Sequence, residues 1–308
     1  MPKIHSGICR NPDCQRPYRG RGKHFCSTPC HTNYQKKYSL LADFKLKAED
    51  ITKNWDSYNL VRDMDFSKFI KIPYTDCIIS GDYHMPFINK EFFERMLAVG
   101  IRYKIPAVVI AGDFLNQDQF SKYGNRNNGK YSFQDELDAA EECIVSLLRV
   151  FKKIYWISGN HDWRIIQSVD YATKYATLAK MIYTSENFII SDRSKMVIEK
   201  NAEIPALISD WTIVHPAKYS KIKNRVPQVM ESKYRTNVVS FHEHVNSHAM
   251  NITSENHCYS IGMMADLKKL AYVHDKEADS SIMENGFLMI RGGYPYNFNN
   301  HIDWDFYL

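Results

Sequence analysis

Short motifs rich in aspartate, asparagine and histidine follow five short apolar runs of this sequence. In chain order they read GDYH, GD, GNHD, H and HEH, and their metal-binding side chains are Asp82, His84, Asp113, Asn160, His161, His215, His242 and His244. Carboxylate, imidazole and amide oxygen together form a ligand set suited to Mn²⁺, Fe or Zn²⁺. Two such ions, about 3.5–4 Å apart, lower the pKa of a bridging water and hold phosphoryl oxygens. The pattern therefore predicts a two-metal centre suited to phosphate chemistry.

The apolar runs before these motifs predict the strands that position the side chains. They cover residues 77–80, 107–111, 154–158, 211–214 and 237–240. A helix is expected from Phe133 to Phe151, because apolar residues recur there at helical spacing, with Ser132 as its cap. Alternating strands and helices predict an α/β fold around a buried sheet, with its site at the carboxyl ends of adjacent strands. Residues 287–306 are expected to form strands with an aromatic tail.

The same motifs resemble the signature of calcineurin-like metallophosphoesterases, over roughly residues 74 to 290. The resemblance implies a four-layer α/β sandwich of two packed mixed sheets flanked by helices. It also implies one ion held by Asp82, His84 and His244, a second held by Asn160, His215 and His242, and Asp113 as the bridge between them. Mn²⁺ is expected first, with Fe or Zn²⁺ as alternatives. Segments 261–266 and 285–287 are similar to bacteriophage-type members of the family.

The resemblance implies further roles near the third and last motifs. His161 falls at the family's catalytic histidine, where a cationic or proton-donating imidazole would assist a departing alkoxide. Asp162 is expected to orient the His161 ring, and Arg164 is a candidate phosphate contact, although an arginine at a helix start is also typical of a surface. Phe241 stands where the family has glycine. If that glycine allows a close backbone approach, Phe241 shifts the loop and weakens the second metal site, and His248 becomes a candidate substitute ligand.

The first 34 residues differ from the rest of the chain. Four of the seven cysteines lie there, at Cys9, Cys14, Cys26 and Cys30, and the gaps inside the two pairs match zinc ligands. His24 or His31 could replace one of them, and a chance cluster or redox pair is the alternative to zinc. Residues 1–34 contain few large aliphatic side chains and are therefore expected to need a metal to fold. They are therefore expected to form a zinc module resembling short fingers of nucleic-acid enzymes, with a partly helical linker at 35–73 and the main domain at 74–308.

The net charge of +5 is unevenly divided. Residues 1–40 carry eight basic side chains and one acidic, a balance of +7, which leaves −2 for the remainder. Between the cysteine pairs lie Arg16, Arg19, Arg21 and Lys23. Such a basic surface would bind the phosphate backbone of nucleic acid, DNA above all, largely without reading its sequence. The alternative is a solvated basic loop on a structural or protein-binding finger.

Three classes of function are compatible with these features. The first hypothesis is a two-metal phosphodiesterase, a nuclease on DNA, with a metal-bridging hydroxide as nucleophile and His161 assisting the leaving group. The second is a phosphomonoesterase on nucleotide or phosphoprotein, of which the protein-phosphatase form is disfavoured because Phe114 and Leu115 follow Asp113 where that branch has Asp-Arg-Gly. The third is a non-catalytic nucleic-acid-binding protein.

The sequence gives no sign of a membrane partner or of export. No apolar run approaches the roughly 18 residues of a membrane span, and the first residues lack the apolar region of a signal peptide. A cytoplasmic location is therefore expected, in the host cytoplasm if a bacteriophage encodes the chain.

Overall fold

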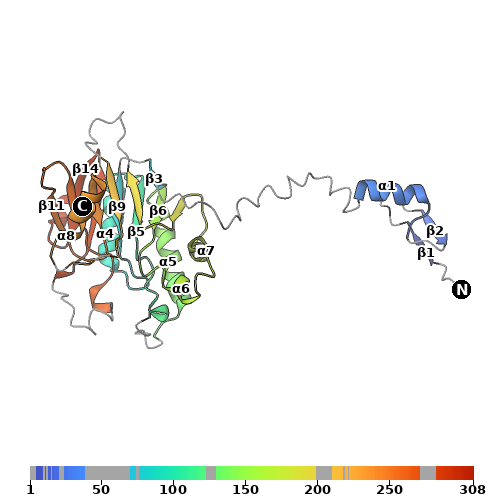
Figure 1. Cartoon of the computed structure of the whole chain (residues 1–308), viewed down its shortest axis with the longest axis horizontal. Coiled ribbons are helices and arrows are strands. Elements are labelled where there is room, and N and C mark those ends of the chain that lie inside the picture. Colours follow the sequence, from blue (N-terminus) through green and yellow to red (C-terminus); the bar gives the residue numbers. More distant parts are fainter. Residues whose placement is uncertain are drawn as a thin grey trace. The chain divides into compact units, whose positions relative to one another are not determined.

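The structure is a computed structural model that describes residues 5–9, 11, 13–14, 16–20, 24–38, 70–73, 76–122, 130–198, 210–217, 219–220, 222–270 and 282–308 (Figure 1). The chain divides into two compact units, Met1–Phe66 and Ser67–Leu308. Most of the expected linker, residues 39–69, lies outside the described residues, as do Arg21 and Lys23. None of the described helices is long and apolar enough to cross a membrane.

The first unit contains a small hairpin and one helix. Strands β1 (His5–Ile8) and β2 (Pro17–Gly20) pair antiparallel, and helix α1 spans Thr28–Tyr38. The N–H of Cys9, just after β1, donates to the carbonyl of Arg16, just before β2, at 2.8 Å. The cysteine pairs thus lie on the hairpin loop and at the start of α1.

The second unit contains two six-stranded mixed sheets. In the first sheet the order is β14 (Tyr294–Asn299), β13 (Gly286–Arg291), β4 (Cys77–Ser80), β5 (Ala107–Ala111), β6 (Lys153–Ile157) and β7 (Phe188–Ser191). In the second it is β11 (Ser247–Met250), β12 (His257–Ser260), β10 (Asn237–Ser240), β9 (Trp211–Val214), β8 (Lys195–Ile198) and β3 (Ile70–Ile72). Strands β4 to β7 run parallel, as do β9, β10 and β12.

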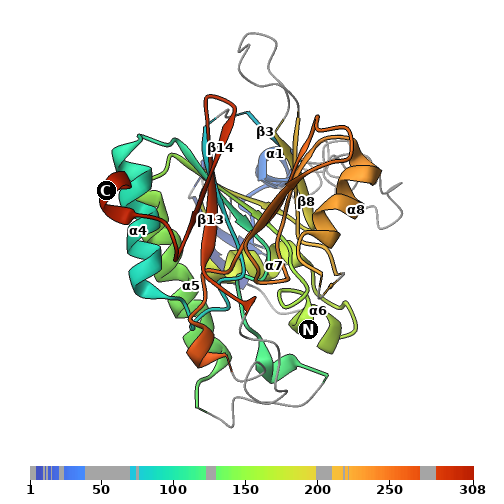
Figure 2. The same cartoon turned by 90° about the vertical axis from the view of Figure 1, so that its left-hand side faces the viewer.

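Alternation along the strands builds two large cores. In β5, Val108 and Ile110 belong to the core against the helices, whereas Val109 belongs to the core between the sheets. Helices α4 (Lys90–Arg102), α5 (Phe133–Leu148) and α7 (Tyr175–Ile182) cover the first sheet, and α8 (Arg225–Tyr234) covers the second (Figure 2). The remaining elements are α6 (Arg164–Ser168), α10 (Trp304–Tyr307), η2 (Asp118–Phe120) and η3 (Leu267–Lys269). The fold is the four-layer sandwich that the resemblance implied.

Most predicted elements are confirmed, with small shifts at their ends. Ser132 caps α5 in a capping box with Asp135. The helix ends at Leu148, three residues before the predicted Phe151, whose buried ring instead packs beside Gly100 of α4. The aromatic tail consists of β13, β14 and the short helix α10.

Candidate metal centre

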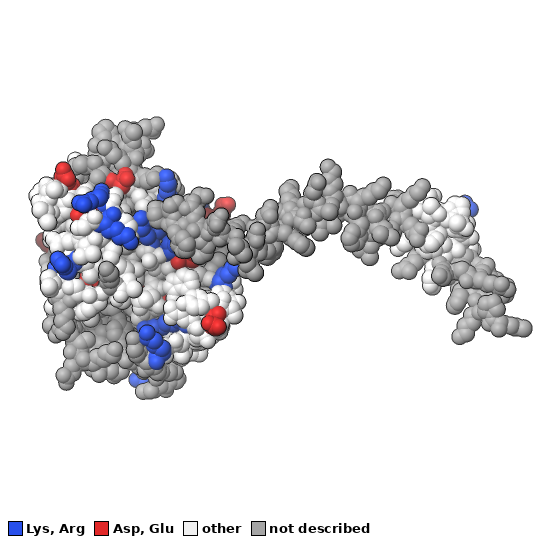
Figure 3. Space-filling model, viewed as in Figure 1, with Lys and Arg blue, Asp and Glu red and all other residues white. Residues whose placement is uncertain are grey.

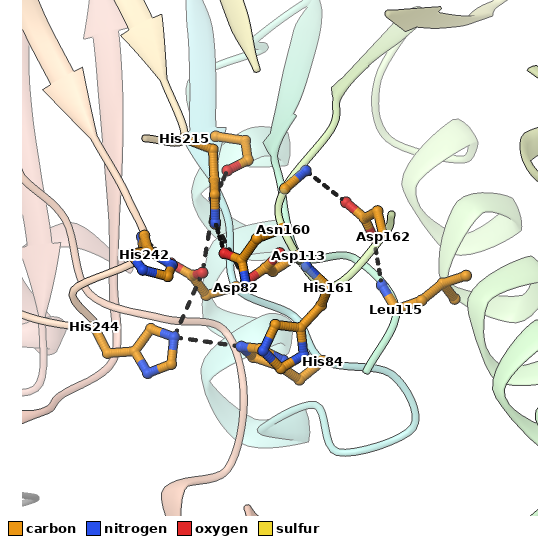
Figure 4. A network of polar contacts seen from close by, with 12 residues as sticks. Asp82, His84, Asp113, Leu115, Asn160, His161, Asp162, His215, His242 and His244 are labelled. Carbon is orange, nitrogen blue, oxygen red and sulfur yellow. Dashed lines mark hydrogen bonds and ion pairs between the residues drawn. The ribbon is translucent and has the colours of Figure 1, made fainter. Parts of the chain in front are cut away.

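The loops after five strands bring the predicted side chains together (Figure 4). Asp82 and His84 follow β4, Asp113 follows β5, Asn160 and His161 follow β6, His215 follows β9, and His242 and His244 follow β10. Three groups have ligand atoms within 4.8 Å of one another: Asp82 with His84 and His244, His84 with Asp113 and His161, and Asp113 with His215 and His242. The first and third groups correspond to the two predicted ion sites.

Asp82 lies at the centre of the first group. One carboxylate oxygen, Oδ2, accepts a hydrogen bond from the backbone N–H of His242 at 3.0 Å. The other, Oδ1, is buried without a hydrogen-bond partner and lies 3.5 Å from Nε2 of His244. The ring of His84 adds a further nitrogen, since its Nε2 lies 3.3 Å from Nε2 of His244. A buried carboxylate oxygen that lacks a donor and faces imidazole nitrogens is suited to a cation.

His215 and Asp113 define the second group. Nδ1 of His215 donates a hydrogen bond to the carbonyl of Ala111 at 2.9 Å. This bond orients the ring so that Nε2 faces the centre. That Nε2 lies 3.3 Å from Oδ2 of Asp113 and 3.3 Å from Oδ1 of Asn160. The remaining oxygen of Asp113, Oδ1, accepts from the backbone N–H of His161 at 2.7 Å. Both sheets therefore contribute to this group, and Asn160 joins it.

Much of the centre has an unusual backbone. Positive φ angles between 46° and 85° occur at Asp82, His84, Asp113, His242 and His244. Non-glycine residues rarely adopt this left-handed conformation, and each instance costs on the order of 1–3 kcal/mol. Neighbouring strand ends hold the conformation, as when the N–H of His84 donates to the carbonyl of Asp113 at 3.0 Å.

Two glycines of the motifs allow the strand ends to approach the ligands. Gly112 has φ +84°, and a Cβ there would lie 2.5 Å from Cγ of the His215 ring. A Cβ on Gly159 would overlap the backbone nitrogen and Oδ1 of Asp113. The glycines are therefore needed for close packing around His215 and Asp113.

The electrostatics of the centre favour ionised carboxylates. Burial opposes ionisation of Asp82, but His244 and His215 outweigh it and lower its pKa. Burial likewise opposes ionisation of Asp113, yet His215 and His161 hold its pKa well below the usual range. For His215, burial lowers the pKa and Asp113 more than reverses this, raising it to about 10. A divalent cation would compete with that proton, so metal binding is expected to release it.

Phe241 does not displace the last motif in the way the sequence suggested. Its ring is fully buried in the core between the sheets, beside Gly81, and its N–H donates to the carbonyl of Val214 at 3.2 Å. The loop thus remains anchored at β9 while His242 and His244 lie in the centre. His248 belongs to neither group, because it lies in β11 with Nε2 2.9 Å from Nδ1 of His257.

His161 lies beside the centre in a hydrogen-bonded arrangement with Arg164. Nδ1 of His161 is 2.9 Å from the carbonyl of Asn116, and Nε2 is 2.8 Å from Nη2 of Arg164. A carbonyl only accepts and a guanidinium only donates, so the proton is on Nδ1 and the lone pair on Nε2. Burial lowers the pKa of His161 to about 3, Asp113 opposes this and Arg164 adds to it. The charged group beside the His161 ring is therefore Arg164, whose Nη1 also pairs with Oδ1 of Asp118 at 2.9 Å.

The expectation that Asp162 orients the His161 ring is wrong. The carboxylate of Asp162 accepts from the backbone N–H groups of Leu115 at 3.0 Å and Gly159 at 2.8 Å. Asp162 therefore connects the loop after β5 to the loop after β6. The carbonyl of Asn116 orients the His161 ring instead. Burial raises the pKa of Asp162 to about 7.

Residues that the motifs did not reveal support these loops. Gln117 accepts from the N–H of Ile165 at 2.8 Å through its side chain, and its own N–H donates to Glu136 of α5 at 2.9 Å. Burial raises the pKa of Glu136 to about 8. The segment after Asp113, which the sequence used only to disfavour a protein phosphatase, thus carries the contacts to His161 and Arg164.

A cavity of about 710 Å³ opens beside the second group. It is lined by Gln119, Phe120, Ser121, Lys122, Asn160, Arg164, Gln167, Ser168, Ala217 and His242. Among its described residues, the wall includes two cationic side chains, Lys122 and Arg164, and no carboxylate, so an anion suits it electrostatically.

The four cysteines of the first unit form a separate cluster. Their sulfur atoms all lie within 4.8 Å of one another, and those of Cys14 and Cys26 are 3.4 Å apart. The backbone N–H of Arg16 and the neighbouring thiols lower the pKa of Cys14 to about 7, whereas Cys14 and Cys26 raise that of Cys30 to about 12. One thiolate therefore forms readily, and zinc would displace the protons of the other thiols. His31 instead packs against Phe25, with ring centroids 4.7 Å apart. The geometry fits a tetrahedral Cys₄ zinc site.

Comparisons with known proteins give the fold no named family. No protein-family model and no curated protein matches the chain. Among solved structures it is similar to Vps29 of Entamoeba histolytica, as a single mutant (10% identity, covering 73% of this chain and 98% of that chain, TM-score 0.37). It is also similar to Vps29 of Chaetomium thermophilum (10%, 70% and 79%, TM-score 0.37) and Vacuolar Protein Sorting 29 of Cryptosporidium parvum (12%, 73% and 96%, TM-score 0.39). Likenesses this weak carry no assignment of activity.

Proposed function

We propose that the chain is a two-metal phosphoesterase that hydrolyses the phosphodiester backbone of nucleic acid, DNA above all. The observation that carries the proposal is the meeting of the Asp82 and Asp113 ligand groups beside a cavity with a cationic wall. Two divalent cations, Mn²⁺ first and Fe or Zn²⁺ as alternatives, would supply a water of lowered pKa and a clamp on the phosphoryl oxygens.

The chain's own residues would perform three tasks around such ions. Asp82 and His84 with His244 would hold one, His215 and His242 with Asn160 the other, and Asp113 would lie between them. The proposal places His161 at the leaving-group side, where Nε2 would reach the departing oxygen in exchange for its contact with Nη2 of Arg164. The Nδ1–H bond to the carbonyl of Asn116 favours positive charge on the ring, but burial outweighs it and lowers the pKa of His161 to about 3, so the ring is neutral before substrate binds.

We further propose that the N-terminal unit holds a structural Zn²⁺ through its four cysteines and tethers DNA. Arg16 is exposed beside this cluster, and Arg19 lies on β2. On the face of the second unit seen in Figure 3, several described basic side chains lie near one another in the upper half, with a few acidic ones around them. A basic tether on the first unit would add to the affinity for a polyanion. Bacteriophage origin and a cytoplasmic location stay predictions.

The test is a substrate panel with the full chain, stripped by a chelator and reloaded with Mn²⁺, Fe²⁺ or Zn²⁺ singly. We expect metal-dependent cleavage of single-stranded or duplex DNA and of simple diesters. Hydrolysis confined to monoesters would favour the phosphomonoesterase, and absence of turnover with both ions bound would favour the non-catalytic binder.

His161→Ala separates catalysis from folding. It should retain both ions and lose most turnover, since His161 belongs to neither of the two groups that correspond to the predicted ion sites. His301→Ala is the matched control, because the exposed ring of this histidine pairs with Glu284 and lies outside every metal group of the described residues. Full activity of His161→Ala would remove the residue from the mechanism.

A further inference from the structure

Arg164 is held rigidly at the wall of the cavity. Its Nη1 donates to Oδ1 of Asp118 at 2.9 Å and to the carbonyl of Asn116 at 2.8 Å, while Nη2 donates to Nε2 of His161. Asp118 is itself only 3% exposed, so the ion pair is shielded from water. A guanidinium fixed in this way loses little side-chain entropy when it binds an anion.

The guanidinium still has donors for a ligand. Its bonds to Asp118, Asn116 and His161 leave other N–H groups unused, because arginine carries five. The side chain is 18% exposed and lines the cavity, so a ligand in the cavity can reach it. Arginine recognises phosphate oxygens by paired hydrogen bonds, which makes phosphate the best-matched anion.

The size and wall of the cavity indicate more than a single phosphate. A volume of about 710 Å³ lies within the range of roughly 300–1,000 Å³ that is typical of small-molecule sites. Phe120 contributes an aromatic ring, which is held edge-on to Phe133 with centroids 5.1 Å apart. A ring and a cation in one wall match a base and a phosphate of a single-stranded nucleic acid.

The position of the cavity connects it to the chemistry. Asn160 and His242 belong both to its wall and to the second metal group, so a polymer bound at the centre has this cavity as its neighbour. We infer that the cavity binds the nucleotide next to the scissile phosphate, and that Arg164 binds the phosphate of that nucleotide. This inference rests on the proposed function, since it names the substrate portion that the same site recognises.

The experiment uses short single-stranded oligodeoxynucleotides of one sequence with a fixed cleavage position. In separate substrates, the phosphate on either side of the scissile one is replaced by an uncharged methylphosphonate. The native protein should cleave one of the two with kcat/KM reduced roughly 10- to 100-fold, as expected when a charge-assisted hydrogen bond is lost. Arg164→Met should cleave the unmodified substrate about as slowly as the native protein cleaves that methylphosphonate substrate. For Arg164→Met, the same methylphosphonate should lower kcat/KM little further.

Controls separate this contact from folding and from the metals. Lys180→Ala removes an exposed cation of α7 outside the cavity and should keep the full difference between substrates. Arg164→Lys keeps the charge but not the paired donors, and should lie between the native protein and Arg164→Met. A readout without turnover is binding of a trinucleotide to the chelator-treated full chain, which Arg164→Met should weaken and Lys180→Ala should not.

The possible outcomes test the role of the cavity separately from the proposed phosphodiesterase function. Cleavage in which native protein and Arg164→Met respond equally to each methylphosphonate would overturn the cavity assignment alone. No cleavage of any diester would overturn both, and unchanged trinucleotide binding by Arg164→Met would also refute the role of Arg164.

Discussion

Replacing Gly112 by alanine should disable one metal group while leaving the other intact. Gly112 has φ +84°, and an added Cβ would press on the His215 ring. The ring would have to move, breaking the bond from Nδ1 of His215 to the carbonyl of Ala111, which is 2.9 Å long and buried. The three nearest atoms to the new methyl group all belong to His215, whereas the N–H of Asp82 donates to the carbonyl of Gly112 at 3.1 Å, so the first group stays intact when this backbone bond is kept.

The chain offers an internal reference for the size of this effect. Gly292 also has positive φ, +57°, but nothing lies within 4 Å of a Cβ built there. Gly292→Ala should therefore cost only the left-handed backbone, about 1 kcal/mol. Gly112→Ala should cost that amount plus about 1–3 kcal/mol for the buried polar groups left unpaired at His215 and Ala111.

Two measurements on the purified full chain test the reasoning. Urea unfolding without metal should show that Gly112→Ala is less stable than Gly292→Ala by the additional amount of about 1–3 kcal/mol that the unpaired polar groups cost. Titration with Mn²⁺ should give about two ions per large unit for the native protein and Gly292→Ala, and about one for Gly112→Ala. Equal stability of the two variants together with unchanged stoichiometry would refute the argument.

Three further outcomes are expected. Phe241→Ala empties a fully buried site between the sheets and should cost about 3–5 kcal/mol in urea unfolding; loss of an ion before unfolding would show that the ring positions the ligands as well. Glu136 has its pKa raised by burial from 4.5 to about 8, so the folded chain binds the proton more tightly and native stability should fall as pH rises between those values. Urea unfolding at about pH 5 and about pH 8 should show a smaller change in the free energy of unfolding for Glu136→Gln than for the native protein. Cys30→Ser should release the zinc of the first unit, whereas His31→Ala should retain it, as metal analysis would show.

The parts of the fold that buried apolar runs encode were accessible from the sequence. Strands such as β4, β5 and β10 are buried along their whole length, which gives short continuous apolar runs typical of parallel strands. The polar residue after each run then marks the carboxyl end. Short or half-buried strands at the outer side of the second sheet, such as β11, carry no comparable pattern and were not predicted.

Contacts that depend on how loops pack were not accessible in this way. The carbonyl of Asn116 orients His161, and a backbone oxygen leaves no signature in the residue type. Asp162 was assigned to the neighbouring ring because carboxylates often hold histidines, but its side chain turns to the N–H groups of Leu115 and Gly159. The place of Phe241 likewise depends on the space beside Gly81, which only the packed sheets define.

The centre lowers the stability of the fold, because its backbone is left-handed at Asp82, His84, Asp113, His242 and His244. At each of them glycine or asparagine would suit the backbone better than the native residue. A library of variants selected only for resistance to heat, without metal, should therefore accumulate glycine or asparagine at these five positions and lose the hydrolytic centre first. Selection on activity would have to act against thermostability here.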